Sequence, residues 1–363
     1  MRLTEVRTYL AGGGESADGW TGIKPFLLVK AVDADGREGW GEAYVLRGRE
    51  TAVAALVRSL ADAYAGRPAA PRPFLAWATG DFGDKRGGID FHAAVSALEL
   101  ALWDLRGKAL GAPVHALLGG ALRPEVPLYA NIWSDRAPDA AAMAERARQA
   151  VAAGFRAIKV YPLAGDGLEA AEARLAAIRQ AVGPQTAVMI DVNGPDDTAF
   201  ALEAGRRFAA YSPFWYEEPV TSDQPERLAE VRRQLGLRIV SGERHGGLTP
   251  FRRLLEAGVA DVLNPDIAGC GGLLTLLEIA ALAQSHGAGV SPHCYDSMGV
   301  GLAAALHASA LLPNLVWLEY FPAMQAASAA CGGGDLEIGG GAARLPTAPG
   351  LGVRVDEAAL TPL

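Results

Sequence analysis

The sequence is short of cysteine, of long apolar runs and of positive charge, and each shortage excludes a class of protein. Its three cysteines, Cys270, Cys294 and Cys331, form no Cys-x-x-Cys pair, which argues against a disulfide framework and a structural zinc site. No apolar run approaches the roughly 20 residues of a membrane span. The N-terminal stretch MRLTEVRTYLAGGGE lacks the apolar core of a signal peptide. We therefore expect a cytoplasmic protein.

The charge balance is acidic, with 33 lysines and arginines against 41 aspartates and glutamates, and a net charge of −8. No basic stripe offsets this charge, so we expect neither a nucleic acid nor an anionic membrane as a partner. A small anionic substrate is still compatible, because a bound metal ion can reverse the local sign of the field. The length of 363 residues suits one large barrel with an additional domain.

The first 122 residues have the pattern of an α+β domain. Strand-like stretches occupy residues 3–10 and 26–32, and the turn signal Asp35-Gly36 precedes the sequence REGWGEA. Helical patterns cover residues 51–64 and 91–110, and glycines and a proline follow the second of them. The loop between the first two strands is rich in glycine and polar residues and contains Trp20.

From Val126 onward, short apolar runs alternate with loops and helical stretches, which predicts a parallel barrel. The runs are VPLYAN, FRAIKVY, AVMIDVN, FWYEEP, LRIVSGE, ADVLNPD, GAGVSPH and LVWLEY. Their C-terminal residues recur every 23–32 positions, and about 250 residues serve the eight βα units of a TIM barrel. We therefore predict a TIM-type barrel over residues 123–321. We expect residues 322–363 to pack back on residues 1–122 and to complete a capping domain with them.

Polar residues end the eight predicted strands, where a TIM barrel places its chemistry. They are Asn131, Lys159, Asp191, Glu217, Glu243, Asp266, His293 and Glu319. The acids Asp191, Glu217 and Glu243 end three consecutive strands and would repel one another in a poorly solvated mouth. Each acid alone could cap a helix or pair with an arginine, but three in register favour a hard cation. All-oxygen ligation suits Mg²⁺, and Mn²⁺ is an alternative.

A cation among carboxylates can chelate a substrate carboxylate and stabilise the enediolate that forms when the α-proton leaves. That reaction needs a base, and Asp266 and His293 end neighbouring strands. An aspartate that accepts from one ring nitrogen would fix the tautomer of His293 and raise its basicity. His245 follows Glu243 by two residues and is a candidate for contact with the substrate. We assign structural roles to the remaining histidines.

Two long motifs resemble the enolase superfamily, and within it the mandelate racemase subgroup. One is AVSALELALWDLRGKALGAPVHALLGG, at residues 94–120, and the other is IDVNGPDDTAFALEAGRRFAAYSPFWYEEP, at residues 190–219. The segments SGE, NPDIAGCGG, SPH and LEY follow in the family's order, so the resemblance covers nearly the whole chain. It implies an α+β capping domain over a (β/α)₇β barrel, and a homo-oligomer.

The resemblance also implies roles for single residues. Asp191, Glu217 and Glu243 would bind one Mg²⁺, with Glu218 as a supporting residue. His293 would be the base with Asp266 as its partner. Lys159 and Glu319 would bind the carboxylate of the substrate.

Two positions depart from patterns in the subgroup. Members with two opposed bases carry Lys-x-Lys after the second strand, whereas this chain has Lys159-Val160-Tyr161. Racemisation needs an acid and a base on opposite faces of the α-carbon, so this departure disfavours a racemase. Tyr161 could act as an acid or only shape the site. Some dehydratases carry a general-acid histidine two residues after the first ligand, where this chain has Asn193.

The preferred hypothesis is a dehydratase of acid sugars. Its substrate would be an aldonate or aldarate, and β-hydroxyl elimination would give a 2-keto-3-deoxy acid. The alternatives are a cycloisomerase of a sugar lactone or anhydro-sugar acid, an epimerase or racemase of a 2-hydroxy acid, and a barrel that binds without turnover. We expect Trp20 and Arg47, on two capping loops, and Asn193 and His245, in the barrel mouth, to contact the substrate.

Overall fold

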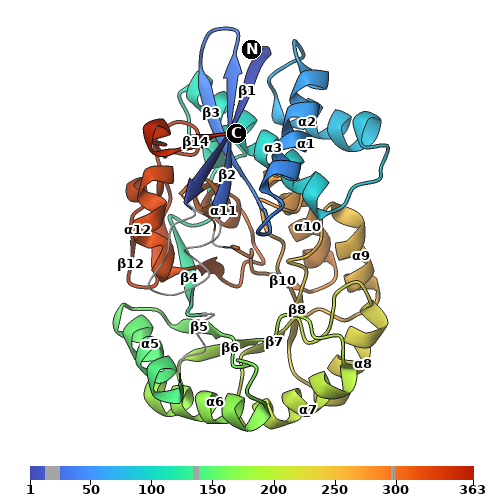
Figure 1. Ribbon diagram of the computed structural model, residues 1–363, viewed down its shortest axis with the longest axis vertical. Helices are drawn as coiled ribbons and strands as arrows, with labels where there is room; N and C mark the ends of the chain where they lie inside the picture. The colour runs from blue at the N-terminus through green and yellow to red at the C-terminus, as the bar shows by residue number, and fades with distance from the viewer. Residues whose placement is uncertain (13–24, 134–138, 296, 298) are drawn as a thin grey trace.

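The structure is a computed structural model that describes residues 1–12, 25–133, 139–295, 297 and 299–363. It contains a four-stranded antiparallel sheet and a larger sheet that forms a barrel. Figure 1 shows the small sheet and its helices above the barrel, with both chain ends at the small sheet. Within the described ranges, no helix is both long and apolar enough to cross a membrane.

The cap is built on a sheet of order β14-β1-β2-β3. Its strands and helices are β1 (Leu3–Gly12), β2 (Pro25–Asp33), β3 (Glu38–Ala43), β14 (Thr361–Pro362), α1 (Glu50–Tyr64), α2 (Pro71–Trp77) and α3 (Ile89–Leu110). Residues 92–105 of α3 are all buried, so this helix is a core element of the molecule. Its backbone packs directly against β3. A Cβ at Gly41 of β3 would lie 1.9 Å from the Ala97 carbonyl oxygen, so only glycine fits at this position.

The barrel contains eight parallel strands and seven helices in the described part of the chain. The strands are β4 (Glu125–Asn131), β5 (Ala157–Val160), β6 (Ala187–Asp191), β7 (Trp215–Glu217), β8 (Ile239–Ser241), β9 (Val262–Leu263), β10 (Gly289–Val290) and β11 (Leu318–Tyr320). The helices are α5 (Ala140–Ala152), α6 (Leu168–Val182), α7 (Thr198–Phe208), α8 (Pro225–Leu235), α9 (Leu248–Glu256), α10 (Leu273–Ser285) and α11 (Gly299–Ser309).

The strands pair in chain order, and the ring closes where β11 pairs with β4. A backbone bridge from Val290 to Leu315 joins the β10 side of the ring. One helix follows each of the first seven strands, which confirms the predicted (β/α)₇β barrel and its α+β cap. All eight predicted strands are present, although β9 and β10 have only two ladder residues each.

The C-terminal segment contacts both the cap and the barrel. Its last strand, β14, pairs with β1 of the cap. Before that, β12 (Ile338–Gly339) and β13 (Ala342–Arg344) form a hairpin whose second strand pairs with β4 of the barrel. The turn residues Gly340 and Gly341 have positive φ, as a two-residue hairpin turn requires. The domain boundaries at residues 122/123 and 321/322 stay a prediction.

Short helical segments complete the chain trace. They are α4 (Val114–Leu117), α12 (Gln325–Ser328), η2 (Ala78–Phe82), η3 (Ala209–Tyr211), η4 (Pro322–Met324), η5 (Ala329–Cys331), η6 (Gly333–Asp335) and η7 (Glu357–Ala359). In α4, the backbone amide of Val114 donates to the Gly350 carbonyl of the C-terminal segment. After α4, the backbone amide of Leu122 donates to the carbonyl of Ala310, which directly follows the barrel helix α11.

Buried carboxylates of the cap hold the starts of barrel helices. Glu99 of α3 accepts hydrogen bonds from the backbone amides of Leu273 and Leu274, at 2.9 and 3.1 Å. Glu42 of β3 accepts from the amide of Gly301 at 2.7 Å. These amides belong to the first turns of α10 and α11, which have no carbonyl partner within their own helix. The cap therefore supplies the N-terminal caps of two barrel helices.

Candidate active site

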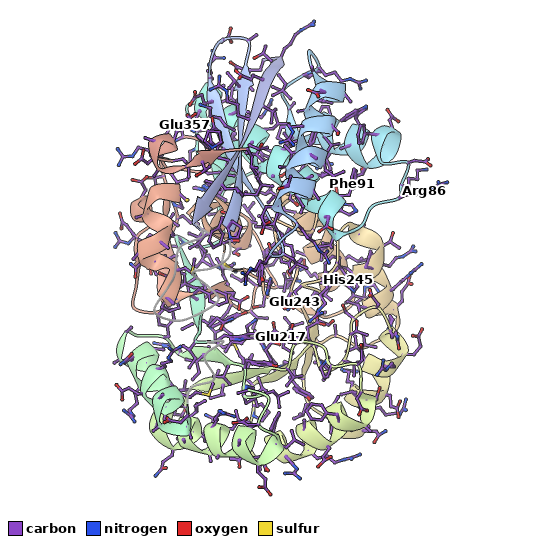
Figure 2. All side chains as sticks on the ribbon, viewed as in Figure 1. Arg86, Phe91, Glu217, Glu243, His245 and Glu357 are labelled. Carbon is purple, nitrogen blue, oxygen red and sulfur yellow. The ribbon has the colours of Figure 1, made fainter. Side chains whose placement is uncertain are left out.

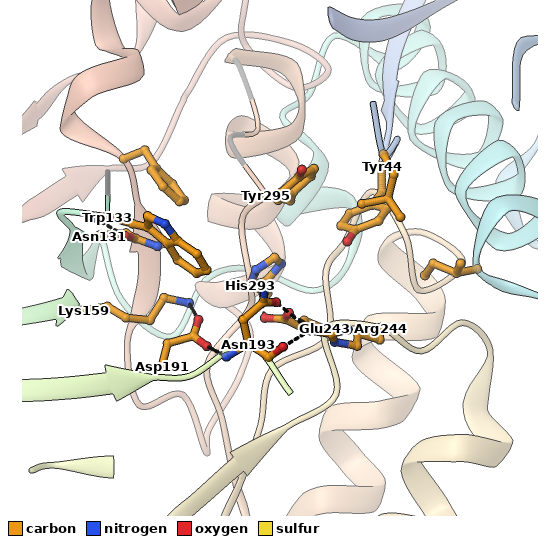
Figure 3. A pocket seen from close by; sticks show the side chains of 13 residues that line it. Tyr44, Asn131, Trp133, Lys159, Asp191, Asn193, Glu243, Arg244, His293 and Tyr295 are labelled. Carbon is orange, nitrogen blue, oxygen red and sulfur yellow. Dashed lines mark hydrogen bonds and ion pairs between the residues drawn. The ribbon is translucent and has the colours of Figure 1, made fainter. Parts of the chain in front are cut away.

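A cavity of about 520 Å³ lies at the C-terminal ends of the barrel strands, beneath the cap. Figure 3 shows the side chains that line it. The lining residues are Tyr44, Leu46, Ile89, Asn131, Trp133, Lys159, Asp191, Asn193, Glu243, Arg244, His293, Tyr295 and Phe321. The first three belong to the cap, so cap and barrel enclose one volume. Polar groups of the barrel thus face a largely apolar wall.

Three carboxylates converge at this cavity, and two of them line it. Asp191 ends β6 and Glu217 ends β7, where the two residues pair directly across the strands. Glu243 follows β8, and one oxygen from each of the three acids lies within 4.8 Å of the others. All three are buried, and Figure 2 shows Glu217 and Glu243 at the centre of the molecule. The register of neighbouring strands therefore produces a group that could hold a metal ion, as predicted.

The raised pKa values of these buried acids indicate that the group needs more positive charge than the protein supplies. Burial, together with the charge of Glu243, raises the pKa of Asp191 to about 6, although Lys159 opposes both effects. Burial also raises the pKa of Glu217 well above its usual value, again against Lys159. One lysine thus does not compensate three buried acids. Hard carboxylate oxygens in this number suit Mg²⁺ or Mn²⁺ better than a softer metal.

Lys159 is the cation within this group. Its Nζ lies 2.7 Å from Glu217 Oε1, 2.8 Å from Glu319 Oε1 and 3.4 Å from Asp191 Oδ2. Burial alone would lower the pKa of Lys159, but these carboxylates raise it well above its ordinary value. The side chain is therefore a charged donor and not a base.

Fixed donors orient the ligand carboxylates. Glu217 accepts hydrogen bonds from Trp215 Nε1 at 2.9 Å and from Asn264 Nδ2 at 3.1 Å. Asp191 accepts from the backbone amide of Asn193 at 2.8 Å. Such partners hold ligand oxygens in one geometry, which is a common arrangement around protein metal sites.

Glu218 follows Glu217 but lies outside the group of three. Its Oε1 accepts from Ser241 Oγ at 2.8 Å and from the amide of Gly242 at 2.9 Å. Its φ of 43° is a left-handed conformation that costs energy in a residue other than glycine. Through these two hydrogen bonds, Glu218 after β7 contacts the end of β8, directly before Glu243.

His293 and Asp266 form a hydrogen-bonded pair beside the carboxylates. His293 Nδ1 lies 2.9 Å from Asp266 Oδ2, and Nε2 lies 3.2 Å from Glu243 Oε2. Asp266 is held in turn by the backbone amides of Ala268 and Tyr295. Burial would lower the pKa of His293, but Glu243, Glu319 and Asp266 together raise it to about 10. An imidazole with this pKa is protonated at neutral pH, and in its neutral form the contact with Asp266 keeps the proton on Nδ1 and leaves Nε2 as the base.

Glu319 lies below the cavity and does not line it. Its Oε1 accepts from Lys159 and from Asn131 Nδ2, and its Oε2 accepts from the amide of Cys294. Burial raises its pKa, but Lys159 and His293 lower it below the usual value. An ionised carboxylate only accepts hydrogen bonds. This geometry favours a role in holding Lys159 over direct contact with a substrate carboxylate.

Tyr161 does not line the cavity either. Its ring stacks on Trp133 with centroids 4.2 Å apart and an interplanar angle of 7°. Burial and the charge of Asp191 raise the pKa of its hydroxyl. The side chain therefore supports Trp133, which does line the cavity.

The remaining predicted contacts are placed differently. Asn193 lines the cavity, but Arg47 is exposed and does not. His245 is buried with its ring 5.9 Å from that of Phe251, outside the cavity lining. Trp20 lies outside the described residues. The catalytic and binding roles of all these residues stay predictions.

Several lining residues were missed in the sequence. Trp133, Tyr295 and Phe321 each lie two positions after a strand-ending polar residue, as Asn193 does. Side chains two apart in an extended chain point to the same side, so this spacing could have identified them. Arg244 directly follows the third acid, and no sequence pattern marked it. Tyr44 and Leu46 belong to the cap stretch of residues 44–50 that contains Arg47 and that we expect to close over the substrate, whereas Ile89 carried no signal.

Comparison with family models identifies two regions of the chain. Residues 15–119 match the mandelate racemase / muconate lactonizing enzyme N-terminal domain. Residues 142–359 match the model described as enolase C-terminal domain-like.

Three proteins of known name match this chain over nearly its whole length. D-gluconate dehydratase of Thermoproteus tenax is 34% identical over 92% of this chain and 69% of its own length. D-galactonate dehydratase of Ralstonia nicotianae is 33% identical over 99% of this chain and 93% of its own. D-galactarolactone cycloisomerase of Agrobacterium fabrum is also 33% identical, over 99% of this chain and 98% of its own.

A solved structure has the same fold throughout. The crystal structure of an enolase from the environmental genome shotgun sequencing of the Sargasso Sea superposes with a TM-score of 0.94. It is 31% identical, and the match covers 99% of this chain and 95% of that one.

Proposed function

Because the chain belongs to the mandelate racemase and muconate lactonizing enzyme family of the enolase superfamily, we propose that it is a Mg²⁺-dependent acid-sugar dehydratase. The single observation that carries the proposal is the position of His293. One nitrogen of its ring is held by Asp266, and the other faces Glu243 at the edge of the cavity. A base so oriented can reach a proton on a carbon whose carboxylate is bound beside the three acids.

The reaction is an elimination of water. His293 Nε2 takes the proton from C2 of an aldonate, and the electron pair moves toward the carboxylate. The C3–O bond then breaks, and His293 returns the proton to the departing hydroxyl, which leaves as water. The resulting enol takes up a proton at C3, loses the proton of its C2 hydroxyl and becomes the 2-keto-3-deoxy acid. One residue serves as base and then as acid.

Asp191, Glu217 and Glu243 would hold the cation. When bound, it would supply positive charge beside the substrate carboxylate and offset the charge of Glu243 that raises the pKa of His293. Lys159 adds a fixed positive charge in the same place, and Glu319 holds Lys159 in position. Preorganised charge of this kind stabilises the anion that forms as the proton leaves.

Elimination is favoured over racemisation because one face of the site lacks a base among the described residues. Lys159 is kept protonated by Glu217 and Glu319. Tyr161, in the place of a second lysine, is stacked on Trp133 and has a raised pKa. Among the described residues that line the cavity, His293 is therefore the candidate for the general base.

A cycloisomerase is the second candidate function. A relative named D-galactarolactone cycloisomerase matches this chain over 98% of its own length. The same base would remove the α-proton, and a ring oxygen in place of the β-hydroxyl would then leave.

A substrate panel with Mg²⁺ tests the proposal. Aldonates, aldarates and sugar lactones are incubated with the enzyme, and 2-keto-3-deoxy products are measured. We expect at least one aldonate or aldarate to give such a product. Consumption of a lactone alone would favour the cycloisomerase, and no turnover of any acid sugar would contradict the dehydratase.

A matched pair of variants tests the base. We expect His293→Asn to lose exchange of the α-proton with deuterated solvent, whereas His286→Asn keeps it. His286 is exposed, and its partners among the described residues are Ser285 and the Leu282 carbonyl. Equal exchange in His293→Asn and wild type would remove His293 from the mechanism. The homo-oligomeric state and cytoplasmic location stay predictions, and sedimentation of the purified protein tests the first.

A further inference from the structure

Arg244 lies at the edge of the cavity with one part of its guanidinium engaged. Its Nη2 donates to the backbone oxygen of Asn193 at 2.8 Å and to Asn193 Oδ1 at 2.6 Å. Its Nε lies 3.8 Å from Glu243 Oε1 and 3.9 Å from Glu218 Oε2, beyond hydrogen-bond distance. Figure 3 shows Arg244 and Asn193 joined beside Glu243. Nη1 has no hydrogen-bond partner among the described residues.

The contact with Arg244 fixes the orientation of the Asn193 amide. A guanidinium has only donors, so the amide atom that it contacts must be the oxygen. The Asn193 Nδ2 is therefore the atom left for another partner, and the residues described in the structure provide none. Asn193 is exposed and lines the cavity, as Arg244 does. Together the two side chains present hydrogen-bond donors and no free acceptor.

The hydrogen-bond donors of Arg244 and Asn193 form one edge of the cavity, here called the donor edge. Its position indicates which part of the substrate it contacts. The substrate carboxylate, the C2 proton and the C3 hydroxyl are already engaged by the cation, Lys159 and His293 in the proposed reaction. The donors of Arg244 and Asn193 are left for an oxygen further along the chain. Glu243 and Glu218 flank Arg244, so the edge is rich in donors without a large excess of positive charge. It suits a neutral hydroxyl better than a second carboxylate.

We infer that Arg244 and Asn193 bind a hydroxyl oxygen of the substrate beyond C3, and that the substrate is an aldonate and not an aldarate. This inference rests on the proposed dehydratase function. Arg244 thereby becomes a residue that determines specificity, and it also orients Asn193.

Three variants separate the contributions. Arg244→Met removes the donors and the charge, and Arg244→Lys keeps the charge but loses the two-pronged contact with Asn193. Asn193→Asp still accepts from Arg244 but replaces the Nδ2 donor with an oxygen. A hydrogen bond to a charged donor is worth about 10- to 100-fold, so we expect kcat/KM for the aldonate to fall by that factor in Arg244→Met. Asn193→Asp should lose a similar factor, and Arg244→Lys less.

Substrates that lack one hydroxyl give the decisive comparison. Aldonates without the C4, C5 or C6 hydroxyl are tested with wild type and Arg244→Met. We expect one of them to be turned over about 10- to 100-fold less well by wild type, and that penalty to shrink to about threefold or less in the variant. A merely structural role for Arg244 would lower kcat/KM by the same factor for every substrate, and that result would overturn the inference.

The control is Arg252→Met, since Arg252 is exposed on α9 and its ion-pair partner in the described part of the chain is Glu256. We expect it to match wild type. If wild type turns over aldonates but Arg244→Met and Asn193→Asp match the control, the inference is wrong and the dehydratase stands. Faster turnover of aldarates than of aldonates would also overturn it. If wild type turns over an aldarate but no aldonate, only the inference is wrong. If it neither binds nor turns over any aldonate or aldarate, as measured by calorimetry and product assay with Mg²⁺, both proposals are wrong.

Discussion

The buried carboxylates at the barrel mouth differ from those at the joint between cap and barrel. At the joint, Glu99 accepts hydrogen bonds from two backbone amides and from Trp103 Nε1, and Asp104 accepts from the amides of Trp40 and Leu351 and pairs with Lys108 Nζ at 2.6 Å. At the mouth, Asp191, Glu217 and Glu243 lie within reach of one another around a single lysine.

The difference lies in what neutralises each group. At Glu99 the donors are neutral and rigid, namely two backbone amides at the start of α10 and the Trp103 indole, and at Asp104 two backbone amides are joined by one lysine, Lys108. The three acids at the mouth converge on one point, and their mutual repulsion is relieved only by added positive charge. Burial of an acid is thus common to both regions, and the geometry of its donors distinguishes a structural carboxylate from a candidate ligand.

Asp191→Asn tests this distinction most strongly. We expect activity with Mg²⁺ to fall at least about 1,000-fold, since a ligand that stabilises several kcal/mol of developing charge is lost. We expect the free energy of unfolding in chelator to stay equal or to rise, because burial raises the pKa of Asp191 and its ionised form is costly. Kinetics and denaturant unfolding measure the two quantities. A loss of stability comparable to that of a joint variant would make Asp191 a structural acid.

Asp266→Asn is the next largest change. Asp266 combines the two kinds of partner, because it accepts from backbone amides and also holds His293. An asparagine would keep an acceptor for one amide but would no longer stabilise the charged or correctly protonated imidazole. We expect kcat/KM to fall about 10- to 100-fold or more, as for other partners of functional histidines.

The pH dependence of kcat/KM separates this effect from misfolding. Asp266 contributes to the raised pKa of His293, so the acidic limb of the profile, along which His293 loses its proton, should move to lower pH in Asp266→Asn. An unchanged limb together with unchanged activity would place Asp266 among the purely structural acids.

The sequence carried different amounts of information on these two regions. Asp191, Glu217 and Glu243 could be found because each ends a predicted strand, and parallel strands bring their ends together. Glu99 lies within a motif that the resemblance identified, but its partners Leu273 and Leu274 lie 174 and 175 residues further along. Nothing local to α3 indicates which helix start it caps. Arg244 was missed for a related reason, since its role depends on Asn193 across the mouth.

Stabilisation by Mg²⁺ should depend on pH. The folded-state pKa of Asp191 is raised to about 6, above its ordinary 3.8, so in chelator its contribution to stability is lost as the pH rises between these values. The cation competes with protons for these acids, so its stabilisation should grow from pH 5 to pH 7.5. At 100 times the Kd of the cation, the gain is about 2.7 kcal/mol. Thermal unfolding with Mg²⁺ and with chelator measures it, and a gain that is constant with pH would contradict the assignment. Asp191→Asn should abolish most of it.

Glu99→Gln should produce the smallest effect, and it should lower stability and leave activity nearly unchanged. Gln offers one acceptor oxygen to three donors, and its own amide group would face the backbone amides at the start of α10. We expect the free energy of unfolding to fall by about 1–2 kcal/mol while kcat/KM changes less than about threefold, since no atom at the mouth loses a partner. Glu278→Gln, in the same helix α10 but half-exposed, is the matched control. Burial raises the pKa of Glu99 to about 7, so if that cost outweighed its three hydrogen bonds, the variant would be more stable than wild type at pH 8. A stabilised Glu99→Gln would therefore show that backbone donors do not compensate the joint carboxylates, and the contrast between the two regions would fail.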